Sequence, residues 1–493
     1  MVQGAMIAGI IAATVVVFRR RGRGRRTDQR AKLLVRSPEA LRRYTDPRRG
    51  PAPDVGPGPL IGRDVVSGRE VRAGWEDVAV AIAGSRMGKT TGWVVPAVLG
   101  APGAVVATSN KRDVVDMTRG AREATGNRVW LYDPQAIAGG EPNWWWNPLD
   151  MAHDIAGART LAGIFATATR EAGAHTDAYF DPEGRELLAA MLLAAALAER
   201  PVTDVYRWLA DPTNDEAVGH LRHADHALAG TGVRGVLGMP EKQRAGIFGT
   251  ARQMIAFLSD PVLARWATVA DDERPRFVAA EFVTGTDTLY ALSMEGPGSA
   301  GPLTAALTAA VLRAAEAHAA RSLRGRLVVP MVCVLDEVAN VCRWKELPDL
   351  YSHYGSRGIV LLSFLQSWSQ GVECWGREAM GKLWGAANLR IYGGGVSEAE
   401  FLDSLSKVLG DVDLPTRSVS DSRWGRQVSA SMRKERVFDP DALAALPARR
   451  AVVLLSGARP VVVAVQPCFE GTHAPAVARS IARYGEGREK KVA

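Results

Sequence analysis

Cysteine is scarce and scattered in this 493-residue chain. The four cysteines form no C-x-x-C pair and no spacing typical of metal ligands; they are Cys333, Cys342, Cys374 and Cys468. The sequence therefore excludes a disulfide-rich secreted domain and a cysteine-built metal site, and it suits free thiols in a reducing compartment. A chain of this length is expected to divide into two or three domains.

A net positive charge is missing from the body of the chain, although the whole chain has a net charge of +8. Residues 19–49 hold thirteen Arg or Lys against three Asp or Glu, so the 444 residues from Gly50 onward sum to about −2. A basic surface over the whole body is thereby excluded, and contact with nucleic acid would need a local surface such as a channel.

Charge is absent from residues 1–18, MVQGAMIAGIIAATVVVF, and six arginines follow within residues 19–26. A secretory signal peptide has its positive charge before the apolar stretch and a cleavage site after it, which is the reverse order. A run of roughly 17 or more apolar residues can span a bilayer, and arginines mark its cytoplasmic side. We therefore expect a single-pass anchor with the body in the cytoplasm. A nucleic-acid-binding tail is the alternative interpretation of the arginines.

Apolar, β-rich runs alternate with intervening helical segments before residue 150 and resume after residue 275, which is typical of a parallel α/β sheet. Between them the chain is Ala/Leu-rich with helical spacing, which indicates a helical insertion. Residues 411–436 are polar and charged and are expected to form an exposed loop or hairpin. The expected domains are 1–18, transmembrane anchor; 19–59, basic juxtamembrane segment and Pro/Gly linker; 60–149, nucleotide-binding domain, first part; 150–275, all-α insertion; 276–475, nucleotide-binding domain, second part; and 476–493, C-terminal tail.

Residues 83–90 read A-x-x-x-x-G-K-T, one residue away from the phosphate-loop pattern, and they follow the apolar run VAVAIA. A strand, a glycine turn and a helix start aim backbone N–H groups and the helix dipole at an anion. Lys89 would reach the β- and γ-phosphates of ATP, and Thr90 would supply a hydroxyl to Mg²⁺. The alternative is a chance G-K-T at a helix start. The expected nucleotide-binding residues are Gly84, Ser85, Arg86, Met87, Gly88, Lys89, Thr90 and Thr91.

Two acids end the apolar run MVCVLDE, residues 331–337. Buried carboxylates are costly without a cation or a proton-transfer role, so Asp336 is expected to hold Mg²⁺ and Glu337 to act as the general base on water. An Asp-Glu pair that merely caps a helix is the alternative. Gln366 ends a further apolar run, and an amide there can sense a γ-phosphate if the two strands are neighbours. The alternative is an ordinary polar strand-end residue.

The run NWWWN, residues 143–147, has two interpretations. Its aromatic rings could stack on unpaired bases, or they could fill the junction between a helical domain and a sheet. Packing is favoured because no Arg or Lys is interleaved.

The order of these motifs resembles a known family. The apolar entrance is followed by SRMGKT, S-N-K-x-D (109–113), YDP (132–134), WNPLD (146–150), a helical insertion, VLDEVAN (334–340) and LLSFLQSWSQ. This is similar to the type IV secretion system coupling proteins, the TraG/TraD-like conjugative DNA transfer ATPases. The resemblance covers roughly residues 60–470.

The resemblance implies a RecA-like P-loop NTPase fold and a bacterial inner-membrane protein, usually a homo-hexamer around a channel. It implies an ATP hydrolase that links relaxase-bound single-stranded DNA, the relaxosome, to the channel proteins of a type IV secretion system. Two departures stand out. The family commonly has two transmembrane helices where this sequence shows one, and its trans-acting arginine has here only Arg357 as a nearby candidate.

Two other functions compete with this interpretation. An FtsK-type translocase of double-stranded DNA usually carries several membrane spans and a C-terminal winged helix, whereas only about 25 residues follow VVVAVQP (461–467). An ATP-regulated membrane scaffold that recruits protein substrates without pumping would be favoured by a missing Glu337, which is present.

Overall fold

The computed structural model describes residues 24–34, 38–46, 53–170, 177–269, 273–296, 298–422 and 425–485. For residues 416–422 and 425–430 it describes the backbone alone. The expected anchor, residues 1–18, lies outside these ranges. Within them, no helix has both the length and the apolar character needed to cross a membrane.

An eleven-stranded sheet forms the centre of the molecule, in the order β2-β1-β13-β12-β9-β3-β8-β7-β4-β6-β5. The strands from β9 to β5 are parallel to one another, and β12, β13, β1 and β2 add an antiparallel edge. The expected α/β fold with a mostly parallel sheet is confirmed. The strands are β1 (Leu60–Asp64), β2 (Glu70–Arg72), β3 (Ala79–Ile82), β4 (Val105–Ser109), β5 (Val129–Tyr132), β6 (Thr288–Leu292), β7 (Met331–Leu335), β8 (Ile359–Leu365), β9 (Leu389–Tyr392), β12 (Arg450–Leu455) and β13 (Val461–Ala464).

Two hydrophobic cores lie on the two faces of this sheet. Val80 and Ile82 of β3 point into the larger core, and Ala79 and Ala81 point into the smaller one. β3, β4, β7 and β8 are buried on both faces, which explains their continuous apolar sequences. The larger core is covered by α13 (Gly301–Arg321), α15 (Leu347–Ser356), α16 (Trp368–Trp375), α17 (Arg377–Ala386) and α18 (Ala399–Leu409). The smaller is covered by α3 (Val95–Leu99) and α4 (Asp113–Glu123).

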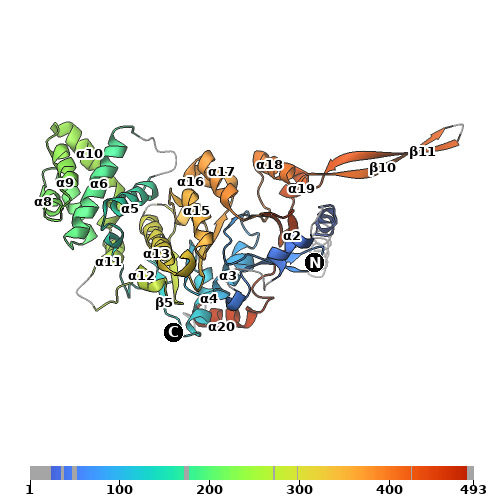
Figure 1. Ribbon diagram of the computed structural model, residues 1–493, viewed down its shortest axis with the longest axis horizontal. Helices are drawn as coiled ribbons and strands as arrows, with labels where there is room; N and C mark the ends of the chain where they lie inside the picture. Colours follow the sequence, from blue (N-terminus) through green and yellow to red (C-terminus); the bar gives the residue numbers. More distant parts are fainter. Residues whose placement is uncertain are drawn as a thin grey trace, which may run out of the picture.

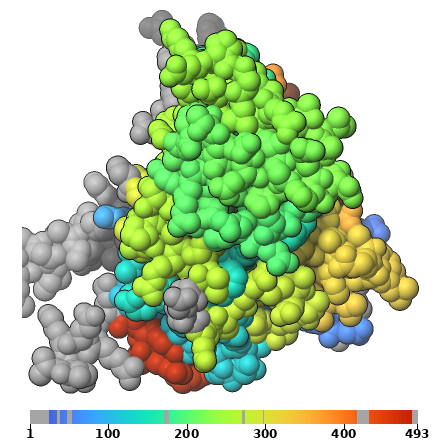
Figure 2. All heavy atoms as spheres, turned by 90° about the vertical axis from the view of Figure 1, so that its left-hand side faces the viewer, coloured from blue at the N-terminus to red at the C-terminus, as the bar shows by residue number. Residues whose placement is uncertain are grey.

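A group of helices stands at one end of the molecule, at the left of Figure 1 and facing the viewer in Figure 2. No strand interrupts these helices between residues 152 and 269 in the part that the structure describes. They are α5 (Ile155–Ala168), α6 (Phe180–Leu197), α7 (Val202–Ala210), α8 (Glu216–His223), α9 (Ala227–Leu237), α10 (Glu241–Met254) and α11 (Pro261–Ala267). Short helices complete the chain elsewhere, namely α12 (Ala279–Phe282), α14 (Val338–Val341) and α19 (Pro440–Ala444).

The tryptophan run lies where these helices meet the sheet. Trp144 and Trp146 are 2% and 1% exposed. The Trp144 ring lies 5.4 Å from the rings of both Trp130 in β5 and Trp266 in α11, and its Nε1 donates to the carbonyl of Leu131 at 3.1 Å. Edge-to-face contacts of this kind stabilise a packed junction, so the structure agrees with the packing interpretation.

The structure differs from the expected linker and tail. Pro38–Thr45, within the range expected to be linker, forms helix α2, and Tyr44 is 2% exposed and donates to the carbonyl of Ser456 at 2.8 Å. The boundary expected at residue 476 falls inside α20 (Ala474–Tyr484), whose Ser480 hydroxyl bonds the backbone of α4. Both segments are short amphipathic helices, and burial of one face attaches them to the sheet domain.

Residues 411–436 form the expected hairpin. β10 (Asp411–Ser422) pairs antiparallel with β11 (Gly425–Arg436) along its whole length, as a sheet separate from the central one. Figure 1 shows this hairpin projecting away from the body beside α18 and α19.

Candidate nucleotide-binding site

The candidate phosphate loop joins β3 to a turn of π-helix, Thr90–Val94, which continues into α3. Gly88 has φ +89°, and Arg86 also has a positive φ of 61°. Ala83 is fully buried at the strand exit, and its N–H donates to the carbonyl of Leu365 in β8 at 3.1 Å. Alanine therefore fits the first position of the pattern, because this residue continues the sheet.

Three consecutive glycines after β9, Gly393–Gly395, pack directly against the phosphate loop. The Gly84 N–H donates to the carbonyl of Gly394 at 2.9 Å. A Cβ on Gly84 would lie 2.1 Å from the carbonyl oxygen of Gly395, and one on Gly393 would lie 2.7 Å from the Cβ of Ala83. This close backbone approach requires glycine on both sides.

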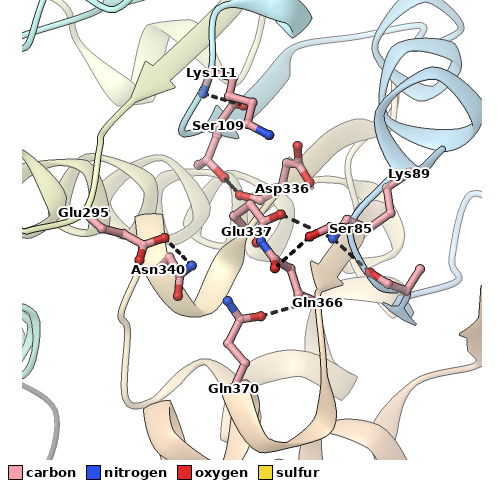
Figure 3. Close-up of polar contacts among 12 residues, drawn as sticks. Ser85, Lys89, Ser109, Lys111, Glu295, Asp336, Glu337, Asn340, Gln366 and Gln370 are labelled. Carbon is pink, nitrogen blue, oxygen red and sulfur yellow. Dashed lines mark hydrogen bonds and ion pairs between the residues drawn. The ribbon is translucent and has the colours of Figure 1, made fainter. Parts of the chain in front are cut away.

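The Lys89 side chain points back toward the start of the loop. Its Nζ donates to the carbonyl of Ala83 at 3.0 Å and to Oε1 of Glu337 at 3.2 Å. The side chains of Lys89 and Glu337 are each 9% exposed. The two residues predicted to contact the γ-phosphate and to activate water are thus brought together as a buried ion pair (Figure 3).

Asp336 and Glu337 follow β7, at the edge where the parallel strands end. Asp336 is 5% exposed, and burial together with the charge of Glu337 raises its pKa to about 7. Oδ1 of Asp336 and Oε2 of Glu337 are buried and accept no hydrogen bond from any residue that the structure describes. Buried acceptors of this kind cost free energy unless a cation or water satisfies them, so the two carboxylates fit a divalent metal and its water.

Glu337 itself has a left-handed backbone, with φ 52° and ψ 43°. A non-glycine residue in this region is strained, and such residues cluster at functional sites. The turn directs its carboxylate back toward the phosphate loop, where it meets Lys89.

Gln366 leaves the end of β8, the strand paired in parallel with β7, so the predicted neighbourhood of the two strands is confirmed. Its side-chain oxygen lies 3.4 Å from the hydroxyl of Ser85 in the phosphate loop. Its backbone N–H donates to the side-chain Oε1 of Gln370 at 2.8 Å. Gln366 therefore lies between the phosphate loop and the start of α16 (Figure 3).

The other residues of the loop differ in their exposure. Ser85 and Arg86 are exposed, Met87 and Gly88 are half-buried, and Thr90 and Thr91 lie on the first turn after Lys89.

Arg357 is not part of this group. It follows α15 and precedes β8, at the opposite end of the strand from Gln366, and its Nε lies 3.4 Å from Oε1 of Glu316 in α13. The structure thus separates Arg357 from the loop of its own chain.

Several polar residues near the carboxylates have no role predicted from the sequence. Asn340 donates its side-chain N–H to Glu295, beyond β6, and the Ser109 hydroxyl accepts from the N–H of Lys111 at 3.2 Å at the end of β4. Thr108 donates to the carbonyl of Asp336 at 3.1 Å. Figure 3 shows Ser109, Glu295 and Asn340 around the two carboxylates, where the parallel strands end. Each follows or ends a strand of the parallel part, a position that could have been searched for polar residues.

A family model described as the TraM recognition site of TraD and TraG matches residues 330–448 of this chain. Two curated relatives named conjugal transfer protein TraG, both from Escherichia coli, are 26% identical over 209 residues. That alignment covers 38% of this chain and 32% of each relative, so the chain matches about a third of their length.

Among solved structures, the unbound conjugative coupling protein TrwBdeltaN70 matches with a TM-score of 0.58 and 16% identity, over 88% of this chain and 94% of that one. The plasmid coupling protein TrwB in complex with ADP and Mg²⁺ matches with a TM-score of 0.59 and 16% identity, over 90% and 96%. At 16% identity, these structural matches establish the fold and nothing more. The family model, the TraG relatives and the TrwB fold together confirm the predicted resemblance to the TraG/TraD-like type IV coupling proteins.

Proposed function

We propose that this chain is a membrane-anchored ATPase that couples relaxase-bound single-stranded DNA to a type IV secretion channel and drives transfer by hydrolysis. The proposal rests mainly on one observation: Lys89, Glu337 and Asp336 are buried close together where the parallel strands end. Similar folds of TrwB were solved with ADP and Mg²⁺ and with a non-hydrolysable ATP analogue, which supports the nucleotide as ligand.

The loop residues Gly84–Thr91 would bind the phosphates through their backbone N–H groups, since the turn leads into a helix start. Thr90 and Asp336 would hold Mg²⁺, whose charge, when bound, offsets the negative charge that develops on the phosphate oxygens. The unpartnered Oδ1 of Asp336 is the feature that fits this ion.

Glu337 would accept the proton of the attacking water through its free Oε2. In the present structure its other oxygen is bound to Lys89 at 3.2 Å. A γ-phosphate offers Lys89 a stronger partner, so nucleotide binding would separate the pair and free the Glu337 carboxylate to contact water. Gln366, held near Ser85, would face the same phosphate.

Arg357 would act on the site of a neighbouring copy in a homo-hexamer. Its position at the far end of β8, remote from its own phosphate loop, suits a role in trans. Arg357→Ala is expected to lower ATP hydrolysis while ATP binding stays intact, because an arginine finger acts on transition-state charge. Glu316→Gln is the matched control, since it breaks the same ion pair and keeps the guanidinium. Equal losses in both variants would show that Arg357 is structural.

The partners proposed are a relaxosome protein, the secretion channel and the membrane. The match to the TraM recognition site spans residues 330–448 and therefore includes the projecting hairpin β10–β11, which supports a protein partner on that side. Residues 1–18 are proposed as the single bilayer anchor in the bacterial inner membrane, with the described body in the cytoplasm. Sedimentation of the full chain with membranes, resistant to carbonate extraction, would support this; release into the supernatant would contradict it.

The test of the proposed function is ATP hydrolysis by the purified full chain with no DNA, with single-stranded DNA and with duplex DNA. We expect single-stranded DNA to stimulate hydrolysis more than duplex DNA, and stimulation to fall steeply with salt because DNA binding rests on phosphate neutralisation. Preferential stimulation by duplex DNA would favour the translocase alternative. ATP binding without hydrolysis would favour the scaffold.

A further inference from the structure

The segment that joins β9 to α18, residues 393–398, touches the candidate nucleotide site twice. At its beginning, the Gly394 carbonyl accepts from the N–H of Gly84 in the phosphate loop at 2.9 Å. At its end, the carboxylate of Glu398 accepts the N–H of Trp368 and the N–H of Ser369, both at 2.8 Å. One short segment therefore holds both the loop and the start of α16.

Glu398 caps the N-terminus of α16, the helix that begins two residues after Gln366. Trp368 and Ser369 are the first residues of this helix, and their N–H groups have no partner within it. A carboxylate on two such donors satisfies them and faces the positive end of the helix dipole. Ser367, the N-cap residue of α16, accepts the N–H of Gln370 with its hydroxyl. The side-chain Oε1 of Gln370 in turn accepts the backbone N–H of Gln366. The backbone around Gln366 is thus fixed by Glu398 and Gln370 together.

An aromatic contact joins α16 to α18. The ring of Phe401 stacks on that of Trp368, with centroids 5.4 Å apart and planes 18° apart. It also meets the edge of Trp384 in α17 at 5.7 Å. Phe401 is 7% exposed, so a displacement of Trp368 must be accommodated by α18.

The hairpin is fastened to α18 at its base. Nη1 of Arg436, the last residue of β11, lies 2.6 Å from Oδ1 of Asp403 in α18. The Ser406 hydroxyl donates to the carbonyl of Phe438 at 2.6 Å, and the N–H of Val437 donates to the carbonyl of Gly410 at 3.1 Å. Any rotation of α18 is therefore passed to β10–β11, which projects far beyond it (Figure 1).

We propose that Glu398 is a positioning residue that ties Gln366 to α18 and so makes the position of the β10–β11 hairpin depend on the bound nucleotide. The proposal rests on the proposed ATPase function. The link that would change is the contact between Ser85 and Gln366, which at 3.4 Å is long and lies at the exposed surface of the loop. A γ-phosphate in the loop would replace Ser85 as the partner of the Gln366 side chain. Residues 366–370 would move with Gln366, and Glu398 would follow because its carboxylate binds the N–H groups of Trp368 and Ser369.

The experiment compares the full chain with Glu398→Ala, Glu398→Gln and Glu400→Gln. Glu400 is the matched control, because it lies two residues along and makes an exposed ion pair with Arg377. Backbone amide exchange of peptides covering 411–415 and 431–436 is measured without nucleotide and with Mg²⁺ plus a non-hydrolysable ATP analogue. ATP hydrolysis is measured in parallel, and thermal unfolding checks that each variant is folded.

In the wild type and in Glu400→Gln, the analogue should change exchange in the hairpin by roughly fivefold or more, the lower end of ordinary coupling between sites. In Glu398→Ala this change should disappear, and kcat should fall roughly tenfold to hundredfold with KM nearly unchanged, because Gln366 is misplaced while the loop is intact. Glu398→Gln keeps one acceptor oxygen and should lie between the two, which preserves the test if Glu398→Ala fails to fold.

A wild type that hydrolyses ATP while its hairpin exchange is unchanged by the analogue would overturn the relay and leave the ATPase function standing. Retention of the full exchange response in Glu398→Ala would do the same. A wild type that neither binds the analogue nor hydrolyses ATP would overturn the proposed function itself, and the relay with it.

Discussion

Two buried aspartates follow parallel strands of the same sheet, Asp133 after β5 and Asp336 after β7, and they are 1% and 5% exposed. Asp133 accepts the N–H groups of Ile137, Ala138 and Gly140 at 2.7, 2.7 and 3.2 Å. Asp336 has one carboxylate oxygen with no partner among the described residues and lies beside the charge of Glu337.

The two aspartates differ in whether the following turn supplies hydrogen-bond donors to the carboxylate. The turn after β5 folds its own backbone around Asp133, so this carboxylate stabilises the fold. The turn after β7 leaves one carboxylate oxygen of Asp336 and one of Glu337 without a hydrogen-bond partner among the described residues, while Lys89 pairs with the other oxygen of Glu337. A fully satisfied buried acid is structural, whereas an unsatisfied pair beside a phosphate loop costs stability and is prepared for a cation.

The largest expected effect concerns the acid that has a proton-transfer role. Glu337→Gln should bind ATP yet hydrolyse it at least ~10²-fold more slowly, because the general base is lost. Lys89→Ala should lose ATP binding itself. Nucleotide affinity and single-turnover hydrolysis measure the two effects separately. Hydrolysis at the wild-type rate by Glu337→Gln would show that Glu337 is not the base.

Asp133→Ala is expected to act in the opposite way. It leaves three backbone N–H groups without their carboxylate, so the free energy of unfolding should fall by about 1–3 kcal/mol or more. ATP affinity per folded molecule should be unchanged, since β5 is an edge strand and four other strands separate it from β3. Chemical denaturation and nucleotide titration test both statements. A selective loss of ATP binding in a stable variant would mean that Asp133 belongs to the site.

The strands, their ends and the phosphate loop could be predicted from the sequence because each rests on a local pattern. VAVAIA before G-K-T and MVCVLDE are contiguous signals, and the parallel pairing of β7 with β8 brings Gln366 beside Asp336 as expected. The roles assigned to these residues stay predictions. Asp133 and Asp336 look alike in the sequence, since both end an apolar run; their hydrogen-bond partners separate them only in the structure.

Contacts between distant segments could not be predicted in this way. Glu398 lies 30 residues from Trp368, and Asn340 lies 45 residues from Glu295. The contact of Gly84 with the glycines after β9 likewise appears only in the fold. Helices α2 and α20 were hidden because each is short and lies beside Pro-, Gly- or Arg-rich residues, so tertiary burial decides their structure.

A further expected effect is a stability difference that depends on pH. The pKa of Asp336 is raised to about 7 in the folded chain, whereas an unfolded aspartate titrates near 3.9. The folded state therefore binds this proton more tightly. Its contribution to stability is fully present below the unfolded pKa and is lost as the pH rises through about 7.

Asp336→Asn removes this titration. In metal-free buffer without nucleotide, its free energy of unfolding relative to the wild type should rise between pH 5 and pH 8, by ~1–4 kcal/mol. Denaturant unfolding at the two pH values measures it, with Asp133→Asn as the control at the other strand end. With Mg²⁺ and ADP present at pH 8 the order should reverse, because the wild type gains binding free energy that the variant cannot. An advantage for Asp336→Asn that persists at saturating Mg²⁺ and ADP would contradict the assignment of Asp336 to the metal.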